Sequence, residues 1–190
     1  MRCAPHGSWI QLIAAEGHLA TVRILLRRQR VAVRNNDVAI YTLSRSQTVA
    51  MSLEECWRFF SDPRNLAKIT PPEMQFIVHS ELPAEIHQGL MIRYTVAPLW
   101  GMPLNWLTEI TQVERPEYFV DEQRVGPYRI WHHEHFFRAL EGGRTEVRDL
   151  VHYVPPFGPL GALLHPLLIR PQLERIFAFR EQALRRMAAE

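Results

Sequence analysis

The stretch Arg129–Val154, RIWHHEHFFRALEGGRTEVRDLVHYV, contains two alternating runs on either side of a glycine pair. Alternate side chains share one face of a β-strand, so Trp131, His133, His135 and Phe137 fall on one face. The large apolar side chains at both ends of that set mark the face as buried. With Glu141-Gly142-Gly143 as a three-residue loop, the stretch predicts an antiparallel hairpin that turns two histidines inward.

Shorter alternating runs precede this hairpin along the chain. The first begins at Ile40, and the others are Met74–His79, Leu90–Ala97, Leu104–Val113 and Tyr118–Val125. Glycine and proline mark the breaks between them, and the connections are too short for crossover helices. We therefore expect seven strands in one antiparallel sheet.

Two helical regions flank the strands. Ser52-Leu53-Glu54-Glu55 matches a capping box, which predicts a helix to about Ser61, and Asp62–Ile69 adds a second helical turn. The tail after Pro155 has apolar residues three or four positions apart and predicts a long amphipathic helix. Pro166 and Pro171 predict a kink or a broken first segment there.

The order of elements predicts an α+β fold over residues 40–190, with a seven-stranded antiparallel sheet wrapped around a long C-terminal helix and two short helices after strand one. Residues 1–39 differ in composition, with six arginines against Glu16 and Asp37. We expect them to form a poorly ordered basic extension. A basic amphipathic helix that contacts a membrane or another protein is the alternative.

Composition excludes several classes of function. The 190 residues carry 22 basic and 20 acidic side chains, a net charge of +2, which gives no reason to expect nucleic acid as a partner. No run reaches the 18 or so apolar residues of a membrane span, although peripheral membrane contact stays open. Cys3 and Cys56 lie far apart, without metal-type spacing, which favours a reducing cytoplasm and a buried thiol at Cys56.

Four segments resemble the SRPBCC superfamily, which includes START-like lipid-transfer domains and polyketide cyclases. They are FFSDPRNLAKITPP (Phe59–Pro72), LNWLTEI (Leu104–Ile110), FVDEQRVGPYRIWHHEHFF (Phe119–Phe137) and QLERIFAFREQAL (Gln172–Leu184). They are most similar to its bacterial ligand-binding, polyketide cyclase/dehydrase-like branch. The resemblance implies a helix-grip fold with an internal cavity, and it leaves open whether the chain binds or catalyses.

The hairpin turns predict which residues face the two histidines. A three-residue loop at Gly126-Pro127-Tyr128 pairs Val125 with Arg129 and places Asp121 opposite His133 and Gln123 opposite Trp131. The Glu141-Gly142-Gly143 loop pairs Leu140 with Arg144 and places Asp149 opposite His135. Two histidines would then each face a carboxylate on the inner surface of the sheet.

Four interpretations of this polar group stay open. It can be a structural network, a polar floor that orients a ligand, an acid–base site using His133, His135 and Asp149, or a metal site. The metal is the least favoured because no third histidine lies on that face, so we predict no metal and no cofactor. The candidate ligand-binding residues are Trp131, His133, His135, Asp121, Gln123, Asp149, Tyr153, Tyr94, Trp106, Phe177 and Arg180.

Arg180 has two interpretations. A solvated guanidinium is the ordinary expectation for an arginine on an amphipathic helix, and contact with Asp149 or an acidic ligand is the alternative. The mouth of the cavity is expected at the loop 98–103 and the segment 154–161, which are rich in proline, glycine and apolar residues.

The sequence therefore predicts a binding protein for a hydrophobic or amphipathic small molecule of lipid, isoprenoid or polyketide type. The first alternative is a cyclase or dehydratase that uses the cavity histidines, and the second is a module that docks on a protein or a membrane. A non-catalytic role is favoured, and the oligomeric state is not indicated.

Overall fold

The structure, a computed structural model, describes residues 39–98 and 101–188. The predicted basic extension, apart from Ala39, lies outside the described residues. The strands are β1 (Tyr41–Val49), β2 (Ile77–Val78), β3 (Met91–Val96), β4 (Leu104–Glu114), β5 (Tyr118–Val125), β6 (Ile130–Leu140) and β7 (Arg144–Val154). The helices are α1 (Leu53–Phe60), η1 (Pro63–Ile69), η2 (Pro72–Met74), α2 (Gly158–Leu164), η3 (His165–Ile169) and α3 (Arg170–Met187).

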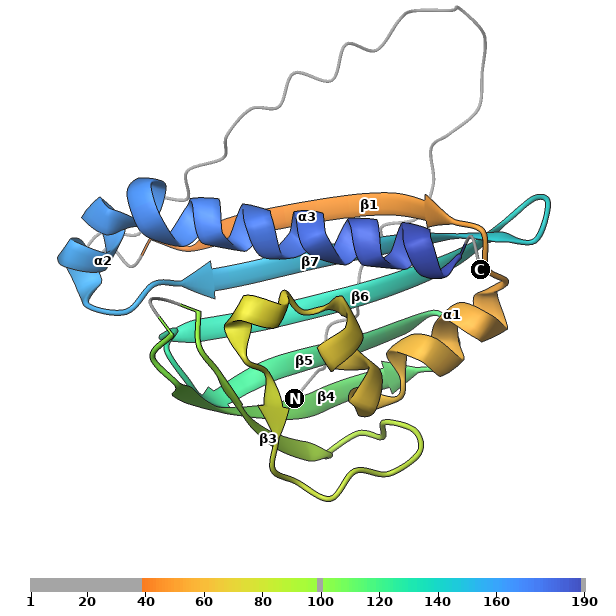
Figure 1. Ribbon diagram of the computed structural model, residues 1–190, viewed down its shortest axis with the longest axis horizontal. Helices are drawn as coiled ribbons and strands as arrows, with labels where there is room; N and C mark the ends of the chain where they lie inside the picture. The colour runs from red at the N-terminus through yellow and green to blue at the C-terminus, as the bar shows by residue number, and fades with distance from the viewer. Residues whose placement is uncertain (1–38, 99–100, 189–190) are drawn as a thin grey trace, which may run out of the picture. The chain divides into compact units, whose positions relative to one another are not determined.

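The strands form one seven-stranded antiparallel sheet in the order β1-β7-β6-β5-β4-β3-β2. Figure 1 shows α3 lying along β1 and β7, with α2 and α1 at opposite ends of the sheet. This arrangement confirms the predicted α+β helix-grip fold. Within the described part of the chain, no helix has the length and apolar character needed to cross a bilayer.

The predicted start of α1 is confirmed. The Ser52 hydroxyl accepts a hydrogen bond from the Glu55 N–H, and the Glu55 carboxylate accepts one from the Ser52 N–H at 2.8 Å. These two bonds satisfy backbone donors that the first turn of a helix leaves free. Behind this turn Cys56 is fully buried, and burial raises the pKa of its thiol to about 11, in agreement with the predicted buried thiol.

The predicted strand Met74–His79 is mostly wrong, because only Ile77 and Val78 pair with β3. Pro72–Met74 forms a short 3-10 turn, and Gln75 then adopts a left-handed conformation with φ of 47°. A strand cannot pass through that conformation, so the chain reaches the sheet edge two residues later.

The β6–β7 register is confirmed, with Leu140 opposite Arg144 and His135 opposite Asp149. On the other side of β6, Asp121 lies opposite His133 as predicted. The predicted pairings of Val125 with Arg129 and Gln123 with Trp131 are wrong, because the β5–β6 ladder ends at Glu122 and His132.

The side chain of Gln123 replaces the missing end of that ladder. Its Nε2 donates to the Tyr128 carbonyl at 2.6 Å, and its Oε1 accepts from the Tyr128 N–H at 3.2 Å. A Cβ on Gly126 would lie 2.3 Å from the Gln123 Oε1, so glycine makes room for the turn.

The C-terminal helix has the broken first segment that its prolines predict. The segment η3, which contains Pro166, is a π-helix between α2 and α3. Gly161 packs tightly on the preceding loop, because a Cβ there would lie 1.7 Å from the Pro156 carbonyl oxygen. Farther along, α3 buries one stripe against the sheet, consisting of Leu173, Phe177, Arg180, Ala183 and Leu184.

Candidate functional site

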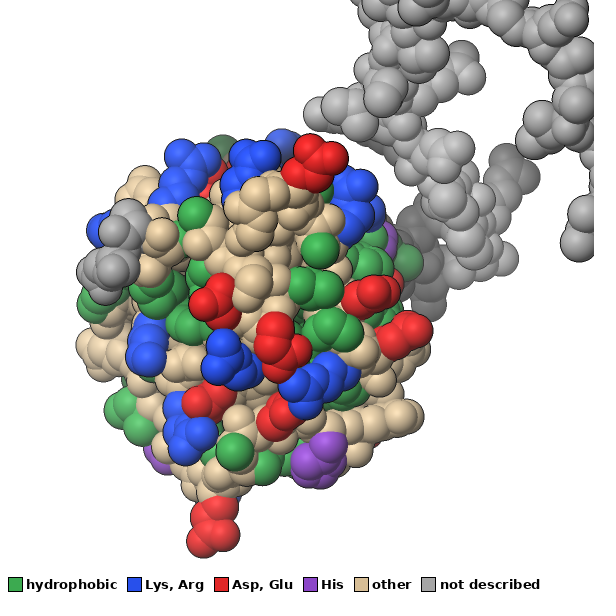
Figure 2. All heavy atoms as spheres, turned by 90° about the vertical axis from the view of Figure 1, so that its right-hand side faces the viewer, with side chains coloured by type: hydrophobic (Ala, Val, Ile, Leu, Met, Phe, Trp, Pro, Cys, Tyr) green, Lys and Arg blue, Asp and Glu red, His purple; other side chains and the backbone are tan. Residues whose placement is uncertain are grey.

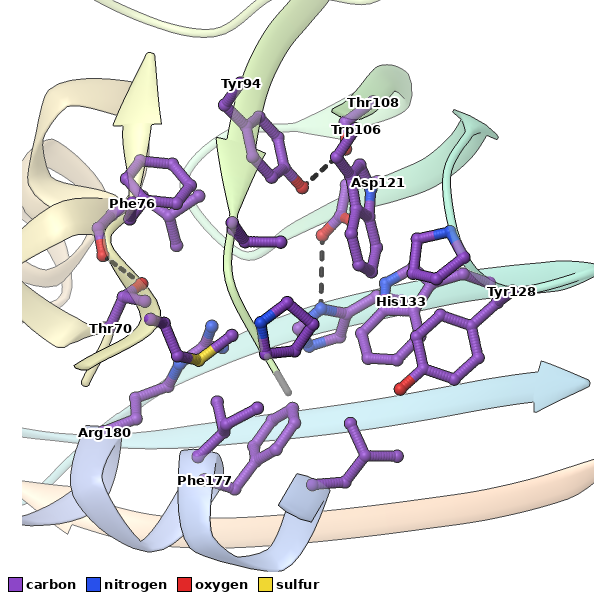
Figure 3. A pocket seen from close by; sticks show the side chains of 18 of the residues that line it. Thr70, Phe76, Tyr94, Trp106, Thr108, Asp121, Tyr128, His133, Phe177 and Arg180 are labelled. Carbon is purple, nitrogen blue, oxygen red and sulfur yellow. Dashed lines mark hydrogen bonds and ion pairs between the residues drawn. The ribbon is translucent and has the colours of Figure 1, made fainter. Parts of the chain in front are cut away.

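A cavity of about 320 Å³ lies between the inner face of the sheet, the short helices and α3. Most of its lining is apolar, with side chains from β3 to β6, from α1 and η1, and from the C-terminal helical region. Figure 3 shows Asp121 and His133 on the sheet side of this space and Phe177 and Arg180 on the α3 side. A charged group from the sheet and α3 therefore lies in a mostly apolar chamber.

The polar group is built by the alternation of β6. His133 and His135 are two positions apart, so both point inward, and they are only 3% and 5% exposed. Their ring centroids lie 3.8 Å apart. The two aspartates come from the strands on either side, Asp121 from β5 and Asp149 from β7.

Each histidine contacts both aspartates. His135 Nε2 lies 2.8 Å from Asp121 Oδ2, and His133 Nε2 lies 3.1 Å from Asp149 Oδ1, both as hydrogen bonds. The remaining contacts are ion-pair distances, 3.2 Å from His133 Nδ1 to Asp121 and 3.0 Å from His135 Nδ1 to Asp149. The two pairs predicted from the sequence form a single network of four residues.

Arg180 joins the network from α3. Its Nη1 lies 3.3 Å from Asp149 Oδ1, and its guanidinium carbon lies 4.9 Å from the centre of the Phe177 ring. The side chain is buried, so the expectation of a solvated guanidinium is wrong and the predicted contact with Asp149 is confirmed. The carboxylate and the aromatic face give a buried cation the partners it needs.

The charges of the network set its protonation. Burial raises the pKa of Asp121, but the charges and hydrogen bonds of His133 and His135 together outweigh burial, and the pKa falls below its ordinary value. Burial also raises the pKa of Asp149, but the positive charge of Arg180 together with the hydrogen bonds of His133 and His135 outweighs burial and lowers the pKa well below the usual range. Burial alone would lower the pKa of His133, whereas the charge of Asp121 raises it. The site therefore favours two carboxylates and a protonated His133.

Aromatic side chains form the wall next to the network. Tyr94 and Trp106 are cross-strand partners on β3 and β4, and their rings stack with centroids 5.9 Å apart. The Trp131 ring meets Trp106 edge-on at 5.5 Å, and Tyr128 lies 4.9 Å from Trp131. A hydrogen bond of 3.0 Å joins the Tyr94 hydroxyl to Thr108.

Two buried nitrogen atoms in residues that line the cavity lack a partner among the described residues. They are Trp106 Nε1 and Arg180 Nε. The indole and guanidinium nitrogens can only donate. Buried polar groups in proteins nearly always have a partner, so these two unpaired donors are an unusual feature of the site.

Most of the predicted ligand-binding residues line the cavity. They are Tyr94, Trp106, Asp121, Trp131, His133, His135, Phe177 and Arg180. The structure places Gln123, Asp149 and Tyr153 outside this lining. Gln123 holds the β5–β6 turn, Asp149 lies behind the histidines, and the Tyr153 hydroxyl lies 2.7 Å from His165 Nε2 at the start of η3.

Several lining residues were not among the sequence-based candidates. Phe59, Phe60, Thr70 and Phe76 reach the cavity from α1, η1 and the segment before β2. The sequence predicts Tyr128 in a turn, yet its ring closes the wall beside Trp131. An aromatic side chain in a short turn, where small and polar residues are usual, was the available signal.

Asp121, His133 and His135 each offer a ligand atom, and these atoms lie within 4.8 Å of one another. Such a set can hold a divalent ion in principle. Two features oppose this use. The ring nitrogens already bond to carboxylates. Metal ligands must also give up their protons, whereas this network favours a protonated His133. The absence of a metal stays a prediction.

No family model matches the chain, and no curated protein matches it in sequence. Its structure is similar to that of the ZhuI aromatase/cyclase from Streptomyces sp. R1128, with 18% identity, a TM-score of 0.64 and coverage of 80% of this chain and 94% of that one. It is also similar to a START superfamily protein from Mycobacterium smegmatis, with 14% identity, a TM-score of 0.59 and coverage of 77% and 98%. The chain therefore has an SRPBCC/START-like fold.

Proposed function

We propose that this chain binds a hydrophobic or amphipathic small molecule with an apolar body and a hydrogen-bond acceptor at one end. The observation that carries the proposal is the cavity of about 320 Å³, which has apolar walls and one buried polar group. Ligand sites of roughly 300–1,000 Å³ commonly combine such walls with a few polar groups that fix orientation. Proteins of the same fold include the aromatase/cyclase, which supports a ligand of aromatic or polyketide character.

The acceptor at one end follows from the polar group. His133, whose pKa the charge of Asp121 raises, and the cationic side chain of Arg180 both line the cavity. A ketone or carboxylate oxygen can accept hydrogen bonds from groups of this kind, whereas a pure hydrocarbon cannot.

Fluorescence titration with Prodan, a naphthalene that carries a ketone, tests the proposal. Ile176 lines the cavity from α3, and Phe179 lies on the same helix outside the lining. The wild type should bind one Prodan with a blue shift of its emission. Ile176→Trp, which places a larger ring in the cavity, should reduce that shift, and Phe179→Trp should retain it. Equal Prodan binding by both variants, with circular dichroism confirming their folding, would overturn the proposal.

A second function is acid–base catalysis of a dehydration, favoured by a protonated His133 at the wall of the cavity. In this step a base of the network takes a proton from the carbon next to a ketone. The carbon–oxygen bond of a β-hydroxyl then breaks, His133 protonates the departing oxygen, and water and a carbon–carbon double bond result.

The aldol adduct of benzaldehyde and acetone is a suitable substrate, because its dehydration product, benzalacetone, absorbs in the ultraviolet. His133→Gln and His135→Gln should lose turnover while Prodan still binds. The control is His132→Gln, which changes a histidine on the outer face of the same strand. Full turnover by both inner variants would exclude this function.

A further inference from the structure

The segment from Phe157 to Ile169 exposes an unusual set of apolar side chains. Phe157 is 76% exposed, and Leu160, Leu163 and Leu167 are 56%, 68% and 71% exposed. Phe157 also has a left-handed backbone with φ of 63°, an unfavourable conformation for a bulky residue. Soluble surfaces seldom gather large apolar side chains in this way unless the patch contacts something.

The helical segment separates two stripes of side chains. Leu164 and Gly161 line the cavity, and Leu168 lines it as well while its side chain stays 38% exposed at the surface. Leu160, Leu163 and Leu167 are spaced three and four residues apart, so they share the outer face. Gly161 fixes this orientation because it packs against the Pro156 carbonyl. The wall of the cavity and the exposed stripe are thus two faces of the same short segment.

Further exposed apolar residues lie at the same end of the sheet. Ile40 precedes the β1 residue that pairs with Tyr153, and Ile130 pairs with Val154 at the end of β7. Met102 and Val125 border the β3–β4 and β5–β6 connections at this end. All four are more than 40% exposed. We call these residues, with Phe157, Leu160, Leu163 and Leu167, the mouth patch.

The two ends of the sheet differ in their content of charged residues. The connections at the mouth end, residues 97–104, 126–130 and 155–173, contain no aspartate or glutamate, and their charged residues are Arg129 and Arg170. Figure 2 shows the opposite end, where acidic and basic side chains alternate over the surface. There Arg115 pairs with Glu54 at 2.5 Å and with Glu85 at 3.3 Å.

We propose that the mouth patch docks on the surface of a lipid bilayer, from which the cavity takes or to which it delivers its ligand. This inference rests on the proposed small-molecule binding. An apolar rim without carboxylates and with two arginines suits a phospholipid surface, where apolar side chains enter the interface and arginines meet phosphates. A ligand then passes from one apolar medium to another without crossing water.

Flotation with phosphatidylcholine vesicles tests this proposal on the full chain. The variant Leu160→Gln/Leu163→Gln/Leu167→Gln changes side chains outside the cavity lining. The control is Met91→Gln, which removes an apolar residue that is 43% exposed at the opposite end of the sheet. The triple variant should bind vesicles at least about tenfold more weakly than the wild type, and the control should match the wild type.

Vesicles of neutral lipid limit the electrostatic attraction between the bilayer and the basic residues among the first 39. All variants retain those residues. Undiminished flotation of the triple variant would overturn the proposal. A wild type that fails to float would also overturn it, and if sedimentation then shows dimers that the triple variant loses, the patch joins two copies instead. Prodan titration of the same variants separates the two proposals. If Prodan does not bind, the proposed small-molecule binding fails, whereas flotation alone decides whether the mouth patch docks on a bilayer.

Discussion

His133 donates its Nε2 hydrogen bond to Asp149, a diagonal neighbour on β7, and not to Asp121, the residue opposite it on β5. His135 does the converse and bonds to Asp121 across the other diagonal. The crossing links three strands through side chains, and Arg180 ties the same group to α3. Removal of one member therefore leaves several buried groups without a partner.

The first prediction concerns stability. Asp149→Ala should lower the free energy of unfolding by roughly 3–5 kcal/mol, because it leaves His133 and Arg180 buried without their carboxylate. Arg138→Ala, which breaks an exposed 2.7 Å pair with Glu146, should change it by less than about 1 kcal/mol. Urea unfolding measures both. Similar effects of the two substitutions would show that the network does not hold the fold.

The second prediction concerns pH. The pKa of His133 is raised in the folded state, so its stabilisation is complete below pH about 6.5 and is lost as the pH rises through the raised pKa. Asp121 and Asp149 have lowered pKa values, so their stabilisation is present above pH about 4 and is lost at lower pH. Burial lowers the pKa of His165, which acts in the opposite sense near neutrality.

Comparison with His133→Gln isolates the His133 contribution. The advantage of the wild type in free energy of unfolding should shrink as the pH rises above about 6.5. Urea titrations at a series of pH values measure this difference. An advantage that grows with pH would mean that His133 is buried in its neutral form.

The third prediction concerns the β5–β6 turn. Gln123→Ala should cost roughly 1–3 kcal/mol, because both of its hydrogen bonds to Tyr128 are lost, and it should weaken Prodan binding by releasing the Tyr128 ring. Gln123→Glu keeps an acceptor for the Tyr128 N–H but sets a second acceptor against the Tyr128 carbonyl, so it should not restore the stability of the wild type. If Gln123→Ala binds Prodan as the wild type does, Tyr128 does not need this anchor.

The fourth prediction concerns ligand recognition. Trp106→Phe removes the unpartnered indole N–H while keeping an aromatic ring in the wall. Its affinity for Prodan should fall by about three- to tenfold. An analogue of Prodan with a methylene in place of the ketone should show no such loss. Equal losses for the two probes would assign the effect to packing and not to a hydrogen bond.

The sequence was sufficient to predict the fold because its signals are local. Alternation located the strands, and Gly142 and Gly143, with φ of 74° and 67°, supplied the left-handed positions that a short hairpin loop needs. Pro72 and the left-handed Gln75 shortened the predicted strand before β3, since a proline pair can start a helical turn as well as stop one.

The sequence predicts only those contacts of the site that depend on strand register alone. The β6–β7 loop length placed Asp149 beside His135, and the inward face of β6 followed from Trp131 and Phe137. The diagonal bonding and the burial of Arg180 depend on how α3 packs on the sheet, which periodicity does not specify. The lining from η1 and Tyr128 depends in the same way on long-range packing.

Mass spectrometry of the purified protein under native and then denaturing conditions shows whether the cavity holds a ligand. The wild type should release a stoichiometric small organic molecule with an apolar body and an oxygen acceptor, and the Ile176→Trp variant prepared in parallel should release less of it. Recovery of the same molecule in equal amount from the Ile176→Trp variant would show that the ligand lies outside the cavity and that the proposed binding site is wrong.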